Sequence, residues 1–301
     1  MQKILVLVLI ILLSACAGGN RALSTTPETN SIESASDQAQ VLPTPKVAPT
    51  IETLPGKEFI PISTMAAEIP WLPLDENSVP MTSFIGINAS VPPFDNPLVR
   101  RAFSLAIDRQ KISDGDKSRG RETSAPATTF IPPQTLGFDL YQVVGLAYDP
   151  VAAKVAFSEA GISDVSQLPP VEIVFYEGSL DLVKAYQEMW KNVLNVDVIL
   201  VPVKSAAELY TYIDEKKPGL FILGIWIADY NDPHNFTFDT FFHPDSHYPA
   251  LGESEFDELI TQAEAAANNP AERQRLYIDA EIILCEEQAF VIPVTHALIS
   301  K

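Results

Sequence analysis

The sequence is poor in cysteine and in positive charge, and each shortage excludes a class of structure or function. Only two cysteines occur in 301 residues, and because Cys16 belongs to an amino-terminal signal, Cys285 has no partner for a structural disulfide. We expect Cys285 to be a buried, unreactive thiol on a helix that begins at Pro270. Lysine and arginine number 20 against 39 acidic residues, a formal charge of −19, which argues against nucleic acid or an anionic membrane as a partner. The same charge favours cationic or zwitterionic ligands only weakly.

Enzyme motifs are missing as well. The sequence contains no G-x-S-x-G, no P-loop and no G-x-G-x-x-G, and no serine or cysteine stands in a nucleophile motif. Two of its four histidines, His243 and His247, have a spacing that would suit a metal on a helix, but Pro244 lies between them. No cysteine or paired glutamate accompanies these histidines. We therefore expect a protein that is not an enzyme and has neither a metal site nor a cofactor.

The amino terminus carries an apolar run that is too short to span a membrane as a mature helix. Lys3 precedes the run Ile4–Leu13, and Ser14-Ala15-Cys16 follows it, with small residues directly before the cysteine. This pattern resembles a bacterial lipoprotein signal, so we expect residues 1–16 to be signal peptide and lipobox. Lipidated Cys16 would then anchor the protein outside the cytoplasm, in the bacterial cell envelope. The alternative is an ordinary signal peptide with an incidental cysteine.

The next segment, residues 17–57, is rich in Ser, Thr, Pro and Ala and has few large apolar side chains. It cannot bury enough surface to offset its conformational entropy, so we expect a disordered tether. Residues 58–301 remain, which is enough for one large domain or two small ones.

Helix and strand patterns alternate through residues 58–301 and predict an α/β fold with a mixed sheet flanked by helices. Strands at Val171–Tyr176 and Val196–Val203 enclose an amphipathic helix at Leu182–Val193, which predicts a right-handed βαβ crossover. The other expected elements are helices after Pro97 and Asp149 and at 205–216, 254–267 and 270–287, strands at 220–227 and 290–294, and a long surface loop at 113–135. We expect the basic pair Arg100-Arg101 to lie on a solvated helix face.

The most informative position is the end of the strand predicted at Leu220–Ile227. The run is apolar apart from Gly224, which indicates a strand covered on both faces, and Asp229 follows it between Trp226 and Tyr230. Because the carboxyl ends of strands in α/β sheets border the ligand crevice, Asp229 suits a ligand with a positive group and an apolar body. The alternative role for Asp229 is to cap the next turn.

Five groups of segments occur in an order that is typical of one protein family. They are Phe84–Asn88 with Pro92–Asn96 and Val99–Arg109; Tyr148-Asp149-Pro150 with Glu159-Ala160-Gly161; Gly224–Pro233; Phe256–Ile260 with Glu272–Tyr277; and Ile292-Pro293-Val294. Their motifs, such as P-P-F-D-x-x-x-V-R-x-A-x-x-x-A-I-D-R and W-x-A-D-Y-x-D-P, resemble those of the family 5 extracellular solute-binding proteins. These are the peptide- and oligopeptide-binding components of ABC importers. The resemblance implies one lobe of a type II periplasmic-binding-protein fold.

The resemblance also implies ligand contacts and partners. In oligopeptide-binding relatives the Asp of W-x-A-D-Y takes the α-ammonium group of the peptide, which implies this role for Asp229, with Trp226 and Tyr230 as walls of the site. The implied ligand is a peptide or another small zwitterionic or cationic solute, and the implied partner is an ABC permease. The segments match the family's second lobe, and we expect the first lobe to be absent or supplied by a separate chain. The alternative is a non-transport interaction or scaffold lipoprotein, or a decayed fragment.

Overall fold

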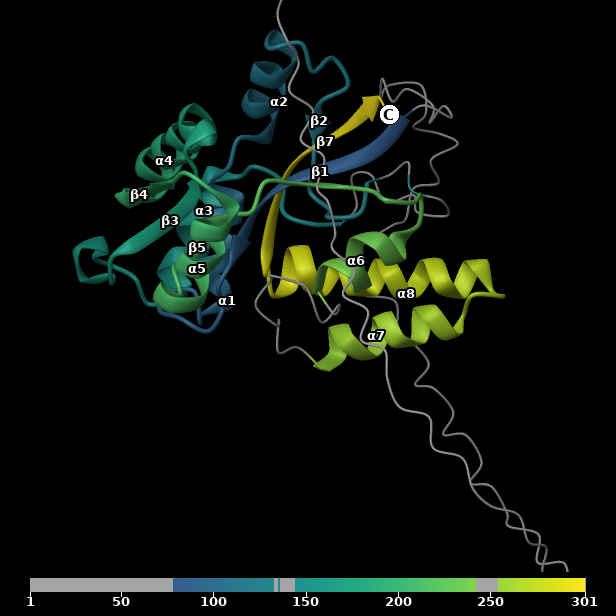
Figure 1. The fold of residues 1–301 in the computed structure, drawn as a ribbon. Coiled ribbons are helices and arrows are strands. Elements are labelled where there is room, and N and C mark those ends of the chain that lie inside the picture. Colours follow the sequence, from purple (N-terminus) through teal and green to yellow (C-terminus); the bar gives the residue numbers. More distant parts are fainter. Residues whose placement is uncertain (1–77, 133–134, 136–143, 242–253, 301) are drawn as a thin grey trace, which may run out of the picture. The chain divides into compact units, whose positions relative to one another are not determined.

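A mixed sheet of seven strands organises the described part of the computed structural model, which comprises residues 78–132, 135, 144–241 and 254–300 (Figure 1). All of these residues belong to one unit of the chain, Leu54–Lys301. The strands are β1 (Ser78–Ile87), β2 (Ala125–Pro126), β3 (Val171–Tyr176), β4 (Val198–Val203), β5 (Leu220–Ile222), β6 (Ile225–Ile227) and β7 (Val291–Ser300). Their order is β2-β7-β1-β5-β3-β4, and β6 also pairs with β1. β3 runs parallel to β4 and β5, whereas β1 is antiparallel to β5, β6 and β7.

Several of the helices begin at a residue whose side chain caps them. The helices are α1 (Pro97–Leu105), α2 (Arg109–Ser118), α3 (Pro150–Glu159), α4 (Leu180–Leu194), α5 (Ala206–Lys216), α6 (Pro233–Phe241), α7 (Ser254–Ala265) and α8 (Pro270–Ile282). Short 3-10 helices lie at Val165–Gln167 and Glu177–Ser179, and α8 continues into a π-helical turn at Ile283–Glu287. Asn96, Asp149 and Ser205 accept backbone N–H groups in the first turns of α1, α3 and α5, as N-cap residues do.

Helices cover both faces of the sheet and form separate apolar cores. α1, α3 and α4 pack against the face of β3 that carries Ile173 and Phe175, and α5 packs against the opposite face through Val174 and Phe221. A further core joins α6, α7 and α8 to β1 and β7. Figure 1 shows α6, α7 and α8 grouped together, apart from the helices around β3, β4 and β5. The chain passes from β5, in the first group, through β6 to α6, in the second.

The predicted βαβ unit with parallel strands is confirmed. β3 and β4 pair in parallel from Val171 with Val198 to Tyr176 with Val203, and α4 connects them. The predicted location of Cys285 is also confirmed, because this cysteine lies buried in the π-helical turn that continues α8. Burial raises the pKa of its thiol well above the usual range. The thiol is therefore protonated at neutral pH, the form that reacts slowly.

The run Leu220–Ile227, predicted as one strand covered on both faces, forms two short strands instead. β5 is buried as predicted, but Gly224 has a φ of +120°, a backbone conformation that favours glycine. Beyond Gly224 the chain enters β6, which within the described residues pairs with β1 alone. Ile225 and Ile227 of β6 are 41% and 43% exposed. The prediction is wrong because the apolar pattern does not reveal the turn at the glycine.

The prediction of a surface loop at residues 113–135 is also wrong. Its first residues belong to α2, which extends to Ser118, and Phe130 and Ile131 are both 0% exposed. The carboxylate of Glu281 accepts hydrogen bonds from the backbone N–H groups of Phe130 at 2.6 Å and of Ile131 at 3.2 Å. A distant glutamate thus satisfies the backbone of this segment, which allows two large apolar side chains to enter the core.

Arg100 corrects a third expectation, since it is only 2% exposed and does not lie on a solvated face. Its Nε donates to the carbonyl oxygen of Gln288 at 2.6 Å, and its Nη1 donates to the carbonyl oxygen of Phe94 at 2.7 Å. The guanidinium group also lies 4.8 Å from the ring centroid of Phe290. Arg101, the other member of the pair, is half-buried. Arg100 therefore ties α1 to the segment between α8 and β7.

Several predictions fall on residues that the structure does not describe. The signal peptide with Cys16, the tether at 17–57 and the pair His243 and His247 all lie outside the described ranges. Within those ranges, no helix has both the length and the apolar character needed to cross a bilayer.

Candidate functional site

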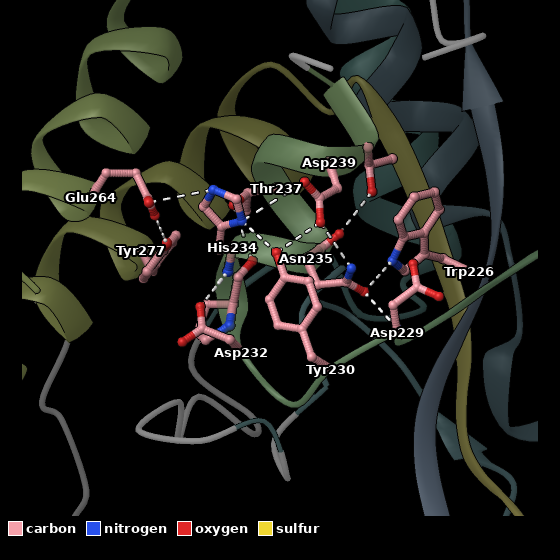
Figure 2. Close-up of polar contacts among 12 residues, drawn as sticks. Trp226, Asp229, Tyr230, Asp232, His234, Asn235, Thr237, Asp239, Glu264 and Tyr277 are labelled. Atoms are coloured by element: carbon pink, nitrogen blue, oxygen red, sulfur yellow. Dashed lines mark hydrogen bonds and ion pairs between the residues drawn. The ribbon is translucent and has the colours of Figure 1, made fainter. Parts of the chain in front are cut away.

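The predicted ligand contacts lie where β6 ends and α6 begins (Figure 2). Ala228 is buried, and its N–H donates to the carbonyl oxygen of Pro80 at 3.0 Å, so the chain stays attached to β1 one residue beyond the strand. Asp229 and Tyr230 follow and are both exposed. Asp232, and not Asp229, accepts the N–H of His234 in the first turn of α6, at 2.8 Å. The carboxylate of Asp229 is thus presented to solvent from a fixed backbone.

The side chain of Trp226 points toward the core, whereas that of Asp229 points toward solvent. It is half-buried, and its ring packs against the core formed with α6, α7 and α8. Its indole Nε1 donates to Oδ1 of Asn235 at 3.1 Å, and the backbone N–H of Asp229 donates to the same oxygen at 3.2 Å. Asn235 in turn donates from Nδ2 to Oδ2 of Asp239 at 2.9 Å. One buried amide therefore holds two of the three predicted site residues, as Figure 2 shows.

Tyr230 lies over the outer side of α6. Its hydroxyl donates to Oδ2 of Asp239 at 2.8 Å and contacts Nδ1 of His234, whose ring stacks on Phe238 with centroids 4.8 Å apart. Burial of the hydroxyl and its hydrogen bond to Asp239 raise the pKa of Tyr230. The hydroxyl is therefore neutral at physiological pH and serves as a hydrogen-bond donor.

A cluster of polar and charged side chains continues from His234 toward α7 and α8. Nε2 of His234 lies 3.3 Å from Oε2 of Glu264, whose Oε1 accepts the hydroxyl of Tyr277 at 2.9 Å. Arg273 binds both carboxylate oxygens of Asp232, at 3.0 and 2.7 Å. A pocket of about 350 Å³ is bordered by Asp232, Glu264, Arg273 and Tyr277. Because its charged groups already pair with one another, this cluster fastens the start of α6 to α7 and α8.

The structure adds site residues that the sequence analysis missed. Asn235 lies six residues beyond Asp229, and only its contacts reveal that it holds the loop. Ile225 and Ile227 form an exposed apolar surface on β6, near Asp229 along the chain. The I-W-I alternation is the one signal that could have found them, because neighbouring residues of a strand face opposite sides. Within the described ranges, no group of three or more His, Cys, Asp or Glu residues could hold a metal.

Comparison with known proteins gives one family and several partial relatives. The bacterial extracellular solute-binding proteins, family 5 (middle region), match residues 30–248. The probable deoxycholate-binding periplasmic protein YgiS of Escherichia coli K12 is 30% identical over 73% of this chain and 41% of its own length. The oligopeptide-binding protein OppA of Bacillus subtilis is 29% identical over 66% of this chain and 37% of its own. The chain thus spans about two fifths of the length of these curated relatives.

Solved structures share the fold. A periplasmic oligopeptide-binding protein of Borrelia burgdorferi superimposes with a TM-score of 0.63 at 23% identity, covering 74% of this chain and 45% of that one. A peptide-binding protein of a peptide ABC transporter gives a TM-score of 0.59 at 22% identity, covering 72% of this chain and 99% of that one. Both neighbours have the periplasmic-binding-protein-like fold, which confirms the fold class predicted from the sequence.

Proposed function

Because the chain belongs to the bacterial extracellular solute-binding proteins of family 5, we propose that it is a membrane-anchored component of an ABC importer that binds peptides. The names of its relatives support this ligand class, since they include oligopeptide-binding and di/tripeptide-binding proteins. Other relatives are named for deoxycholate and for heme, so peptide is the commonest but not the only ligand among these names. The family consists of binding proteins rather than enzymes, in agreement with the lack of enzyme motifs.

The observation that carries the proposal is the exposed carboxylate of Asp229 beside an apolar strand face. We propose that Asp229 binds the α-ammonium group of the peptide and that Ile225 and Ile227 contact its apolar side chains. Opposite unit charges ~4 Å apart attract by ~4 kcal/mol at an effective dielectric constant of about 20, before desolvation is subtracted. One such pair orients a peptide without supplying all of its affinity. Trp226 and Tyr230 support this site, Trp226 from the core side and Tyr230 from the surface of α6.

Asp229→Asn is expected to weaken the binding of trileucine by ~1–3 kcal/mol, because a hydrogen bond to a charged group is lost. Binding of N-acetyltrileucine, which has no ammonium group, should not change. Isothermal calorimetry with both peptides measures the two effects. Fold stability should stay within about 0.5 kcal/mol, since the side chain is exposed.

The matched control is Asp214→Asn, which removes an exposed carboxylate from α5. It changes the net charge equally and should leave both affinities unaltered. Equal trileucine affinities for wild type and Asp229→Asn would show that Asp229 does not bind the ammonium group.

Cys16→Ser is expected to release the protein from membranes or to leave an unprocessed precursor. The proposed anchor consists of acyl chains on Cys16, and each buried methylene contributes ~0.8 kcal/mol to membrane binding. Metabolic labelling with a radioactive fatty acid, followed by fractionation, measures both properties. If wild type takes up no label and the variant fractionates in the same way, the lipid anchor does not exist.

A further inference from the structure

We propose that Asn235 is a positioning residue for ligand binding, because it sets the place from which the Asp229 carboxylate meets the ligand. The proposal rests on the ammonium contact proposed above for Asp229. Asn235 lies in the first turn of α6 and is 0% exposed, so it cannot touch a solvent-borne ligand itself. Any effect that it has on binding must pass through the residues that it holds.

Both acceptor sites of its amide oxygen are used by the loop that carries Asp229. An amide oxygen has two lone pairs, and Oδ1 of Asn235 receives the N–H of Asp229 at 3.2 Å and the indole N–H of Trp226 at 3.1 Å. The first of these bonds fixes the backbone at the residue that bears the carboxylate. The second fixes the side chain that anchors β6 against the core. Asn235 therefore joins the end of β6 to the start of α6.

Asp239 fixes the orientation of this amide. Nδ2 of Asn235 donates to Oδ2 of Asp239 at 2.9 Å, and the hydroxyl of Tyr230 donates to the same oxygen at 2.8 Å. A flipped amide would turn its NH₂ group toward two donors and its oxygen toward a carboxylate. Only one orientation therefore satisfies all of the groups. Asn235 and Asp239 act as a pair that fixes both ends of the segment from Trp226 to Tyr230.

The first test measures local order in the full chain, independently of any ligand. Asn235→Ala should accelerate hydrogen exchange by about tenfold at the Asp229 amide and at the Trp226 indole N–H, the equivalent of about 1.4 kcal/mol. The buried indole N–H of Trp190, which donates to the carbonyl oxygen of Phe103 at 3.0 Å, is the internal control and should be unaffected. NMR spectroscopy resolves these three hydrogens. A general loss of stability would accelerate exchange at Trp190 as well.

The second test uses trileucine and N-acetyltrileucine as probes of the ammonium contact. In Asn235→Ala the preference for free trileucine over the acetylated form should fall by about tenfold. Asn235→Asp should behave in the same way, because it places a carboxylate against Asp239. The double variant Asn235→Asp with Asp239→Asn keeps an acceptor for the Asp229 N–H and restores a donor between the two side chains. It should regain most of the exchange protection and of the peptide preference.

The outcomes separate this proposal from the one on which it rests. If Asn235→Ala exchanges like wild type at Asp229 and Trp226, Asn235 does not order the loop and the proposal is overturned. It is also overturned if exchange accelerates while the preference for free trileucine stays constant. A wild-type chain that binds both peptides equally contradicts the ammonium contact itself, and with it the role of Asn235. The failure of the contact thus appears in wild type, and the failure of positioning appears only in the variants.

Discussion

Replacing Arg100 with methionine is expected to lower the free energy of unfolding by ~3 kcal/mol, because it removes buried charge-assisted hydrogen bonds. The change leaves the carbonyl oxygens of Gln288 and Phe94 without the donors that reach them at 2.6 and 2.7 Å. It also removes the cation that lies over the ring of Phe290. Urea denaturation followed by circular dichroism measures the loss.

The neighbouring arginine provides the matched control. Arg101 is half-buried and donates to the carbonyl oxygen of Glu286 at 3.1 Å. Arg101→Met should cost about 0.5–1.5 kcal/mol, the range for an ordinary hydrogen bond. Equal losses for the two variants would contradict the view that Arg100 joins α1 to the segment before β7.

A second large effect is expected from pH, through the buried Glu281. Burial raises the pKa of this carboxyl group from 4.5 to about 7, and the hydrogen bonds from Phe130, Cys285 and Ile131 only partly oppose the shift. Between these two pH values the folded chain holds a proton that the unfolded chain has lost. The stability that Glu281 contributes is therefore fully present below pH 4.5. About 3 kcal/mol of it is lost as the pH rises to 7.

The stability that His296 contributes has the opposite dependence on pH. Burial lowers its pKa from 6.5 to about 3, so the folded state keeps the imidazole neutral while the unfolded state binds a proton. The stability that it contributes is present above pH 6.5 and is lost as the pH falls toward 3. Between pH 4.5 and 6.5 the contributions of Glu281 and His296 therefore nearly cancel.

The variant Glu281→Met separates the contributions of Glu281 and His296 to the pH dependence of stability. This variant removes the carboxyl group and leaves His296 in place, so its stability should rise by ~3 kcal/mol between pH 4.5 and 6.5 relative to that of wild type. Urea denaturation at half-unit steps of pH gives both curves, and all other titrating groups cancel in the difference. Parallel curves would mean that Glu281 is ionised in the folded protein throughout this range.

Local signals made part of the fold predictable. Asn96, Asp149 and Ser205 cap helices that begin at the next residue, and the β3–α4–β4 unit follows from neighbouring segments of sequence. The other predictions failed because they depend on interactions between residues that are far apart in the sequence. Arg100 is buried because its acceptor is Gln288, 188 positions away. Phe130 enters the core because Glu281, 151 positions away, satisfies its N–H.

The candidate site, too, could be predicted from the sequence only in part. The W-x-A-D-Y-x-D-P segment located Asp229, Trp226 and Tyr230 together at the end of a strand, and the structure places them there. Sequence alone did not give the direction in which each side chain points. That direction depends on Asn235 and Asp239, which become neighbours of the loop only once α6 packs beside β6.

The turn at Gly224 also has an evolutionary consequence. It divides an apolar stretch into β5, whose side chains fill the cores, and β6, whose isoleucines face solvent. Selection for folding acts strongly on Leu220 and Ile222, because any change of volume there disturbs close packing. It acts weakly on Ile225 and Ile227, which can drift or adapt without loss of the fold. A single glycine thus separates positions where the core penalises substitution from positions that the core leaves free to change.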